Sequence, residues 1–134
     1  MTVCNCVAFH NLKFDKPEFR EQFFDKRNTD CRLRAFVREA VDNFPGYDWV
    51  ITSARRKPEH VGSGHNYKIL SAFDLRSRTW TVPQLIAFHD WCNRWWTTKP
   101  DLIDVIIEDG RFDKSYEGYA PHIHIEIAEK KYWK

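Results

Sequence analysis

A strict alternation of apolar and polar residues near the end of the chain constrains the fold more than any other feature. Three isoleucines alternate there with polar or small residues: His122, Ile123, His124, Ile125, Glu126, Ile127 and Ala128. Successive side chains of a strand point to opposite faces, so the isoleucines anchor one face while both histidines project from the other. The pattern predicts a strand over 122–128 with one buried face, which needs neighbouring strands and a covering layer.

Helical periodicity supplies that covering layer. Apolar residues recur at helical spacing over about 30–44: Leu33, Phe36, Val37, Ala40, Val41 and Phe44. Thr29 or Asp30 can cap this helix, and Pro45-Gly46 stops it. A second helix is expected from about 82 to 96, with Pro83 in its first turn, and a shorter one over 17–26.

Short runs of aromatic and β-branched residues predict further strands. They cover 47–52, 71–76 and 101–108, with a long polar loop over 53–71. Helices interleaved with a few short strands favour a small α+β domain with a central, mostly antiparallel sheet and flanking helices. A chain of 134 residues can bury one core, so we expect a single domain over 1–134 and a monomer.

Composition excludes several classes of protein. The formal net charge is +2, and no run of like charges suggests a nucleic-acid or membrane partner. The first residues of the chain lack the pattern of a signal peptide, and no apolar segment is long enough to cross a membrane. We therefore expect a protein made in the cytoplasm. Four cysteines are present, and we expect reduced thiols; Cys4-x-Cys6 with His10 lacks the paired spacing of a structural zinc site.

Four residues have the chemistry of metal ligands, and three of them make a suitable zinc site. His122 and His124 share a strand face, which favours a common task such as binding a cation, although an H-x-H pair also occurs by chance on solvated strands. Asp74 lies within an apolar strand and needs a compensating partner. His65 lies upstream in a glycine-containing turn. Zinc held by His65, Asp74 and His124 would keep one coordination position open for water, the pattern of catalytic rather than structural zinc.

These segments together resemble a known family. Thr52-Ser-Ala-Arg-Arg56, then Ser63-Gly-His65 through Ala72-Phe-Asp74, then His122-Ile-His124 are similar in order to the motifs of the D-Ala-D-Ala metallopeptidases and their relatives. That group includes phage L-alanyl-D-glutamate endolysins, lysostaphin-type enzymes and the hedgehog signalling domain. The resemblance covers about residues 30–128. It implies a hedgehog/D-Ala-D-Ala peptidase-like fold and a Zn²⁺ ion on His65, Asp74 and His124.

The resemblance also implies roles for residues around the metal. Arg56, with Arg55 as the alternative, matches the arginine that grips the substrate's carboxylate. His65 and Asp74 are farther apart than in the family's pattern, which leaves His60 as a substitute ligand.

The general base has two candidates. Glu117 matches the hedgehog arrangement, in which a glutamate precedes H-x-H, whereas His122 matches endopeptidases in which the first histidine assists the water. We favour His122, because its place beside the metal follows from the strand. Glu108 and Glu126 are interpreted as solvated strand residues.

The function expected from this resemblance is hydrolysis of amide bonds in peptidoglycan stem peptides or related D-amino-acid peptides. A phage-type lysis enzyme acting at the bacterial cell wall fits it. One alternative is a non-catalytic, zinc-stabilised binding domain of the same fold. A distant alternative is an HUH-type nuclease, since H-hydrophobic-H is also a metal motif of rolling-circle replication enzymes. That class needs a tyrosine on a downstream helix, and only ten residues follow His124.

Overall fold

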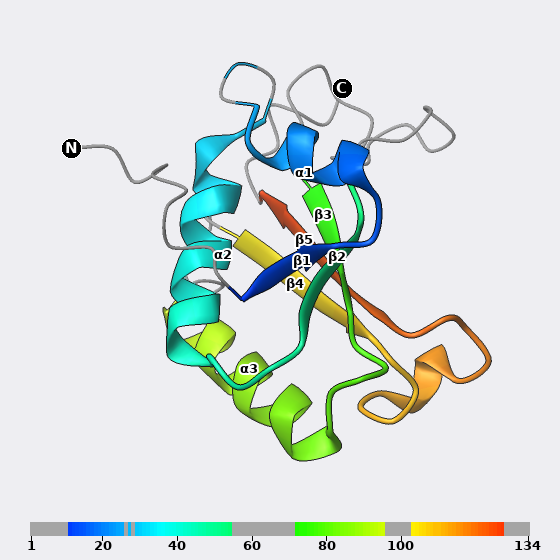
Figure 1. Cartoon of the computed structure of the whole chain (residues 1–134). Helices are drawn as coiled ribbons and strands as arrows, with labels where there is room; N and C mark the ends of the chain where they lie inside the picture. Colours follow the sequence, from blue (N-terminus) through cyan, green and yellow to red (C-terminus); the bar gives the residue numbers. More distant parts are fainter. Residues whose placement is uncertain (1–10, 26, 28, 55–71, 96–102, 128–134) are drawn as a thin grey trace.

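The computed structural model describes residues 11–25, 27, 29–54, 72–95 and 103–127, with the side chain of Trp95 excepted. These residues form an α+β architecture with a five-stranded mixed sheet and three α-helices (Figure 1). In chain order the elements are β1 (Leu12–Phe14), α1 (Pro17–Phe23), α2 (Cys31–Asn43), β2 (Trp49–Ser53), β3 (Ala72–Arg76), α3 (Val82–Trp95), β4 (Ile103–Glu108), a short 3₁₀ helix (Lys114–Tyr116) and β5 (His122–Ile127). The predicted α+β class is confirmed. Within the described residues, no helix has the length and apolar character needed to cross a membrane.

The sheet has the strand order β1-β2-β3-β5-β4. β1 pairs with β2 in parallel, and the pairs β2–β3, β3–β5 and β4–β5 are antiparallel. The expected predominance of antiparallel pairing is therefore correct, but the parallel edge strand β1 was not predicted. β5, the last strand among the described residues, lies inside the sheet between β3 and β4, so its side chains have strand neighbours on both sides.

Capping and proline residues determine where two of the helices begin. The Asp30 side chain accepts a hydrogen bond from the Arg32 backbone N–H (2.9 Å), which makes Asp30 the N-cap of α2. Pro17 occupies the first turn of α1. The main predicted helices are present with nearly the expected bounds, and the strand expected at 47–52 runs instead from Trp49 to Ser53.

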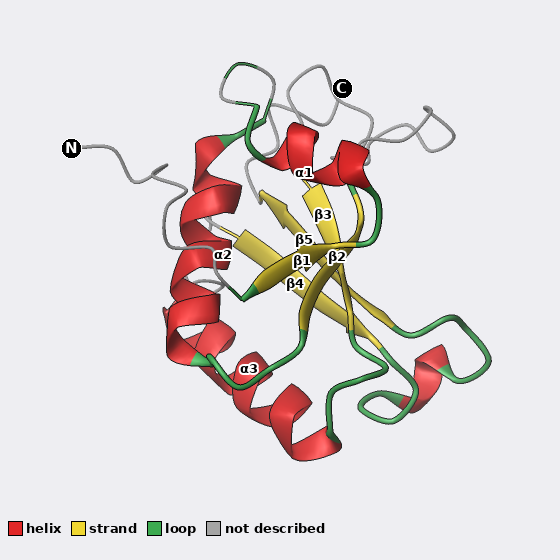
Figure 2. Ribbon diagram, viewed as in Figure 1, coloured by secondary structure: helices red, strands yellow, loops and turns green. Residues whose placement is uncertain are grey.

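The core lies on one face of the sheet, where the helices cover it (Figure 2). Ile123, Ile125 and Ile127 of β5 have no exposed surface, as the alternation predicted. They belong to one apolar cluster to which all three helices contribute, with the fully buried Leu33, Phe36, Val37 and Ala40 from α2 and Leu85 and Phe88 from α3. The opposite face of the sheet therefore carries the alternate, polar positions of the same strands.

An ionic network around the buried Asp109 ties the ends of β3 and β4 together. We call Ser77, Asp109 and Arg111 the anchor cluster. The Ser77 hydroxyl donates to Asp109 Oδ2 (2.7 Å), while Arg111 donates through Nε to Oδ1 (3.1 Å) and through Nη2 to Oδ2 (2.8 Å). Arg111 also donates to the carbonyl oxygens of Trp80 and Ser77. Hydrogen bonding by Arg111 lowers the pKa of Asp109 to about 2 against the opposing effect of burial. The network fixes the start of the connection that leads to β5.

Candidate functional site

Strand register arranges the polar face into rows that cross the sheet. β3 pairs with β5, and β5 with β4, so that side chains from three strands stand abreast. The two rows are Asp74, His124 and Ile106, and then Arg76, His122 and Glu108. Because residues two apart on a strand share a face, Asp74 and Arg76 project to the same side, as do His122 and His124. Residues from three segments of the sequence thus converge on one surface.

His124 is held between two carboxylates. Its Nδ1 lies 3.0 Å from Asp74 Oδ1, and its Nε2 lies 2.9 Å from Glu126 Oε1. All three side chains are largely shielded, with 16% of His124, 9% of Asp74 and 10% of Glu126 exposed. We call Asp74, His124 and Glu126 the carboxylate–histidine cluster. Its members come from β3 and β5 only.

The electrostatics of this cluster favour a cation. Burial on its own would lower the pKa of His124, but the hydrogen bonds and negative charges of Asp74 and Glu126 together raise that pKa to about 9. A neutral imidazole has one N–H donor and one acceptor nitrogen, so it cannot donate to both carboxylates. The cluster therefore needs either a protonated His124 or a cation in place of one of the two imidazolium protons.

The donor set matches what a metal-binding histidine requires. Such a histidine binds metal through one ring nitrogen and usually donates the other N–H to a carboxylate, which fixes the ring. Asp74 and the Nδ1 atom of His124 would face the metal, and Glu126 on Nε2 would fix the ring. Within the described residues, no group of three or more His, Cys, Asp or Glu side chains is arranged to hold a metal ion. The third expected ligand, His65, lies outside these residues, as do Arg55, Arg56 and His60.

His122 lies in the neighbouring row with a carboxylate of its own. Its Nδ1 is 2.9 Å from the carbonyl oxygen of Ala120, and its Nε2 is 3.1 Å from Glu108 Oε2. A carbonyl oxygen only accepts hydrogen bonds, so the Nδ1 atom carries a proton and Nε2 faces the carboxylate. About a third of each side chain is exposed. His122 and Glu108 are thus a solvent-accessible pair suited to passing a proton.

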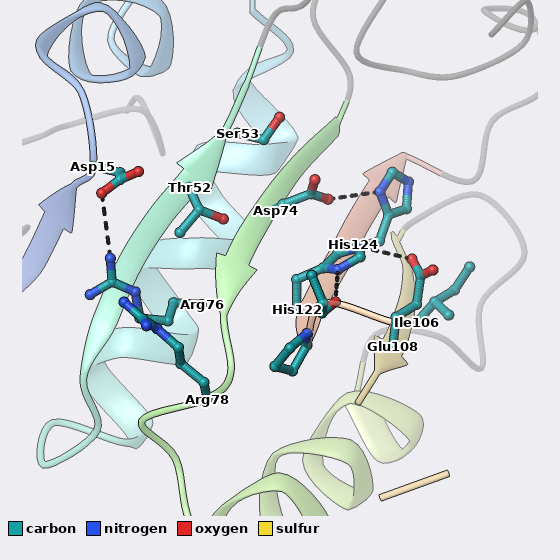
Figure 3. A pocket seen from close by; sticks show the side chains of 12 residues that line it. Asp15, Thr52, Ser53, Asp74, Arg76, Arg78, Ile106, Glu108, His122 and His124 are labelled. Atoms are coloured by element: carbon teal, nitrogen blue, oxygen red, sulfur yellow. Dashed lines mark hydrogen bonds and ion pairs between the residues drawn. The ribbon is translucent and has the colours of Figure 1, made fainter. Parts of the chain in front are cut away.

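Both histidines open into one hollow of about 920 Å³ on the polar face (Figure 3). Asp74, His122, His124 and Glu108 line it from β3, β5 and β4, and Arg76 and Arg78 line it on the side toward Asp15. The hollow reaches across four strands, because Thr52 and Ser53 of β2 also line it, and it combines acidic, imidazole and guanidinium groups. A short extended peptide can lie across it.

Glu117, the other expected base, does not line this hollow. It lines a smaller neighbouring one of about 450 Å³ with Tyr116 and Gly118, and it packs against Gly110. The two hollows share Pro121. The structure therefore brings His122, rather than Glu117, beside His124.

One glutamate was misjudged from the sequence, and the partner of another was missed. Glu126 was expected to be solvated, yet it is buried against His124. Glu108 is partly exposed, in keeping with the expectation, but its pairing with His122 was not predicted. Strand parity was a signal for Glu126, because it shares the face of both histidines. The partner of His122 depended on the register between β4 and β5, which the sequence does not reveal.

Known proteins offer no guide to the chemistry of this site. Scans of the chain against protein-family models, curated proteins and solved structures find no match. The function is therefore argued from the arrangement of the side chains and from the resemblance of the motifs.

Proposed function

We propose that this chain is a zinc-dependent peptidase that hydrolyses amide bonds in peptides of bacterial cell-wall type. The observation that carries the proposal is the contact between Asp74 and His124, which are expected as zinc ligands and lie 3.0 Å apart on the open face. They come from strands β3 and β5, fifty residues apart in sequence. The resemblance to the D-Ala-D-Ala metallopeptidases supplies His65 as the third ligand and the hedgehog-like fold.

Each described residue then has a chemical task. Zinc bound there would lower the pKa of a water molecule and polarise a carbonyl group. Asp74 and His124 hold the ion, and Glu126 fixes the His124 ring by accepting its Nε2 proton. The Ala120 carbonyl oxygen orients the His122 ring by accepting its Nδ1 proton, so that Nε2 takes a proton from the attacking water and delivers it to the leaving amine. Glu108 stabilises the imidazolium that forms in between, since its carboxylate lies 3.1 Å from Nε2. Arg56 as a grip on the substrate remains a prediction from the resemblance.

The substrate class follows from the same resemblance and from the shape of the site. A hollow that spans four strands accepts a short extended peptide, such as a peptidoglycan stem peptide that contains D-amino acids. A role in lysis at the cell wall, as in phage endolysins, fits this activity.

The proposal is tested with the full chain loaded with zinc and incubated with peptidoglycan fragments. Products are identified by mass spectrometry with and without a chelator. We expect a chelator-sensitive cut that is lost in Asp74→Asn and reduced about 100-fold in His122→Gln. The matched control is Asp90→Asn, a change at an exposed aspartate of α3 whose side chain is 67% exposed.

Two outcomes contradict the proposal. Intact fragments from several wall chemistries, with zinc bound to the protein, would favour a zinc-stabilised binding domain. Cleavage that survives both the chelator and Asp74→Asn would place the activity elsewhere on the chain.

A further inference from the structure

Two arginines stand at one side of the hollow, away from the histidines. Arg76 ends β3 on the polar face, and Arg78 follows in the turn after it. Figure 3 shows both side chains on the Asp15 side of β3, with His122 and Glu108 on the other side. The charged groups are therefore unevenly distributed around the hollow, with guanidinium groups on one side and carboxylates with imidazoles on the other.

A carboxylate already lies against this basic side. Arg76 Nη2 is 3.4 Å from Asp15 Oδ1, and the side chains of Arg76 and Asp15 are 23% and 47% exposed. Ion pairs so open to water contribute little to stability, so an incoming anion can displace Asp15. Arg78 is exposed as well. Guanidinium groups bind carboxylates through two parallel hydrogen bonds, which makes this side of the hollow suitable for a carboxylate ligand.

The distance between Arg76 and Asp74 determines how far the bound carboxylate of a peptide lies from the amide bond that is cut. Arg76 is two residues from Asp74 on the same strand, which places their backbones about 7 Å apart. An extended peptide advances about 3.5 Å per residue. A carboxylate held by the arginines is therefore one or two residues from an amide bond that lies over Asp74 and His124.

We propose that Arg76 and Arg78 form a subsite for the carboxylate of a peptide whose cleaved amide bond is one or two residues away. The subsite deepens the proposed function and rests on it for the position of the cut. It assigns substrate recognition to residues other than Arg56. Asp15 is its internal competitor, because it neutralises Arg76 when no ligand is bound.

Binding is the readout that separates this subsite from catalysis. The probes are two synthetic tripeptides that end in D-alanine, identical except that one ends in a free carboxylate and the other in a carboxamide. Their dissociation constants are measured by calorimetry with the full chain, in chelator so that zinc-dependent cleavage cannot occur. We expect the acid to bind at least about 10-fold more tightly than the amide.

Variants then assign the preference to the arginines. Arg76→Gln and Arg78→Gln should each remove most of the preference for the acid, and Arg78→Lys should restore part of it. Asp15→Asn should strengthen binding of the acid several-fold, because it frees Arg76. Arg94→Gln, at an exposed arginine of α3, is the control and should change nothing.

The experiments distinguish a failure of the carboxylate subsite from a failure of the peptidase proposal. Equal binding of acid and amide, or a preference that survives both Arg→Gln changes, overturns the subsite even if the zinc-loaded protein cuts peptides. A preference that depends on the arginines supports the subsite, and if it is accompanied by no cleavage with zinc, only the peptidase proposal fails.

Discussion

The anchor cluster and the carboxylate–histidine cluster are two ionic groups around buried carboxylates, and they differ in the kind of cation that faces those carboxylates. In the anchor cluster, Asp109 faces the permanently charged Arg111 and the Ser77 hydroxyl, so its formal charge is zero. In the other cluster, Asp74 and Glu126 both face His124, whose charge depends on pH because an imidazolium can lose its proton. The first group is complete as a structural element. In the second, a metal ion can replace a proton of His124, which is why we assign function to it.

The largest expected effect concerns pH, and it separates the two clusters. The pKa of His124 in the folded protein, about 9, lies above its ordinary value of 6.5. In the zinc-free protein its contribution to stability is therefore fully present below about pH 6.5 and is lost as pH rises through 9. The measurement is the difference in free energy of unfolding between wild type and His124→Gln, by urea titration in chelator from pH 6 to 10.

Asp109 behaves in the opposite sense. Its folded-state pKa of about 2 lies below the ordinary value of 3.8, so its contribution is present above about pH 4 and is lost as pH falls through 2. It therefore adds no slope between pH 6 and 10. If the difference between wild type and His124→Gln stays constant across that range, the carboxylates do not hold the proton on His124.

Loss of charge in the anchor cluster should be the next largest effect. Asp109→Asn leaves Arg111 without its carboxylate and should lower the free energy of unfolding by about 2 kcal/mol. Asp74→Asn keeps a hydrogen-bond acceptor near His124 and leaves Glu126 as its carboxylate, so it should cost less than Asp109→Asn in chelator. Urea titration of both variants at neutral pH compares them. Equal losses would remove the distinction between the structural and the functional cluster.

The sequence predicted the two faces of β5 unequally. Period-two alternation settles which side chains of the strand are buried, so the isoleucine face was expected. Helical periodicity predicted the helices over it, with Thr29 or Asp30 as the cap of α2, and the structure has Asp30 there. β1 was missed because three residues carry too little pattern, and its parallel pairing depends on the path of the chain through α1 and α2.

The site was predicted in its residue types but not in its pairings. Asp74 and His124 were singled out by an aspartate among apolar neighbours and by H-x-H. Their contact, and that of Glu108 with His122, follows from strand register, which many distant residues determine together. Glu126 was within reach of the sequence argument, because parity places it on the face of both histidines.

The smallest expected effect on stability belongs to the exposed pair. His122→Gln and Glu108→Gln should each change the free energy of unfolding by about 0.5 kcal/mol or less, because the pair is open to water. Activity should respond differently, with a fall of about 100-fold in kcat for His122→Gln and a smaller fall for Glu108→Gln. Parallel urea titrations and rate measurements on cell-wall fragments check this. A rate unchanged in His122→Gln would return Glu117 to consideration as the base.

Titration of the metal-free protein with zinc, followed by calorimetry in buffers of different ionisation enthalpy, tests the central claim most directly. We predict one zinc ion per chain and release of about one proton at about pH 7.5, since His124 must give up a proton to bind the metal. Asp74→Asn should lose this binding, and Asp90→Asn should keep it. Zinc binding that is unchanged in Asp74→Asn, or no zinc binding by the wild-type chain, would contradict the assignment of the carboxylate–histidine cluster as a metal site.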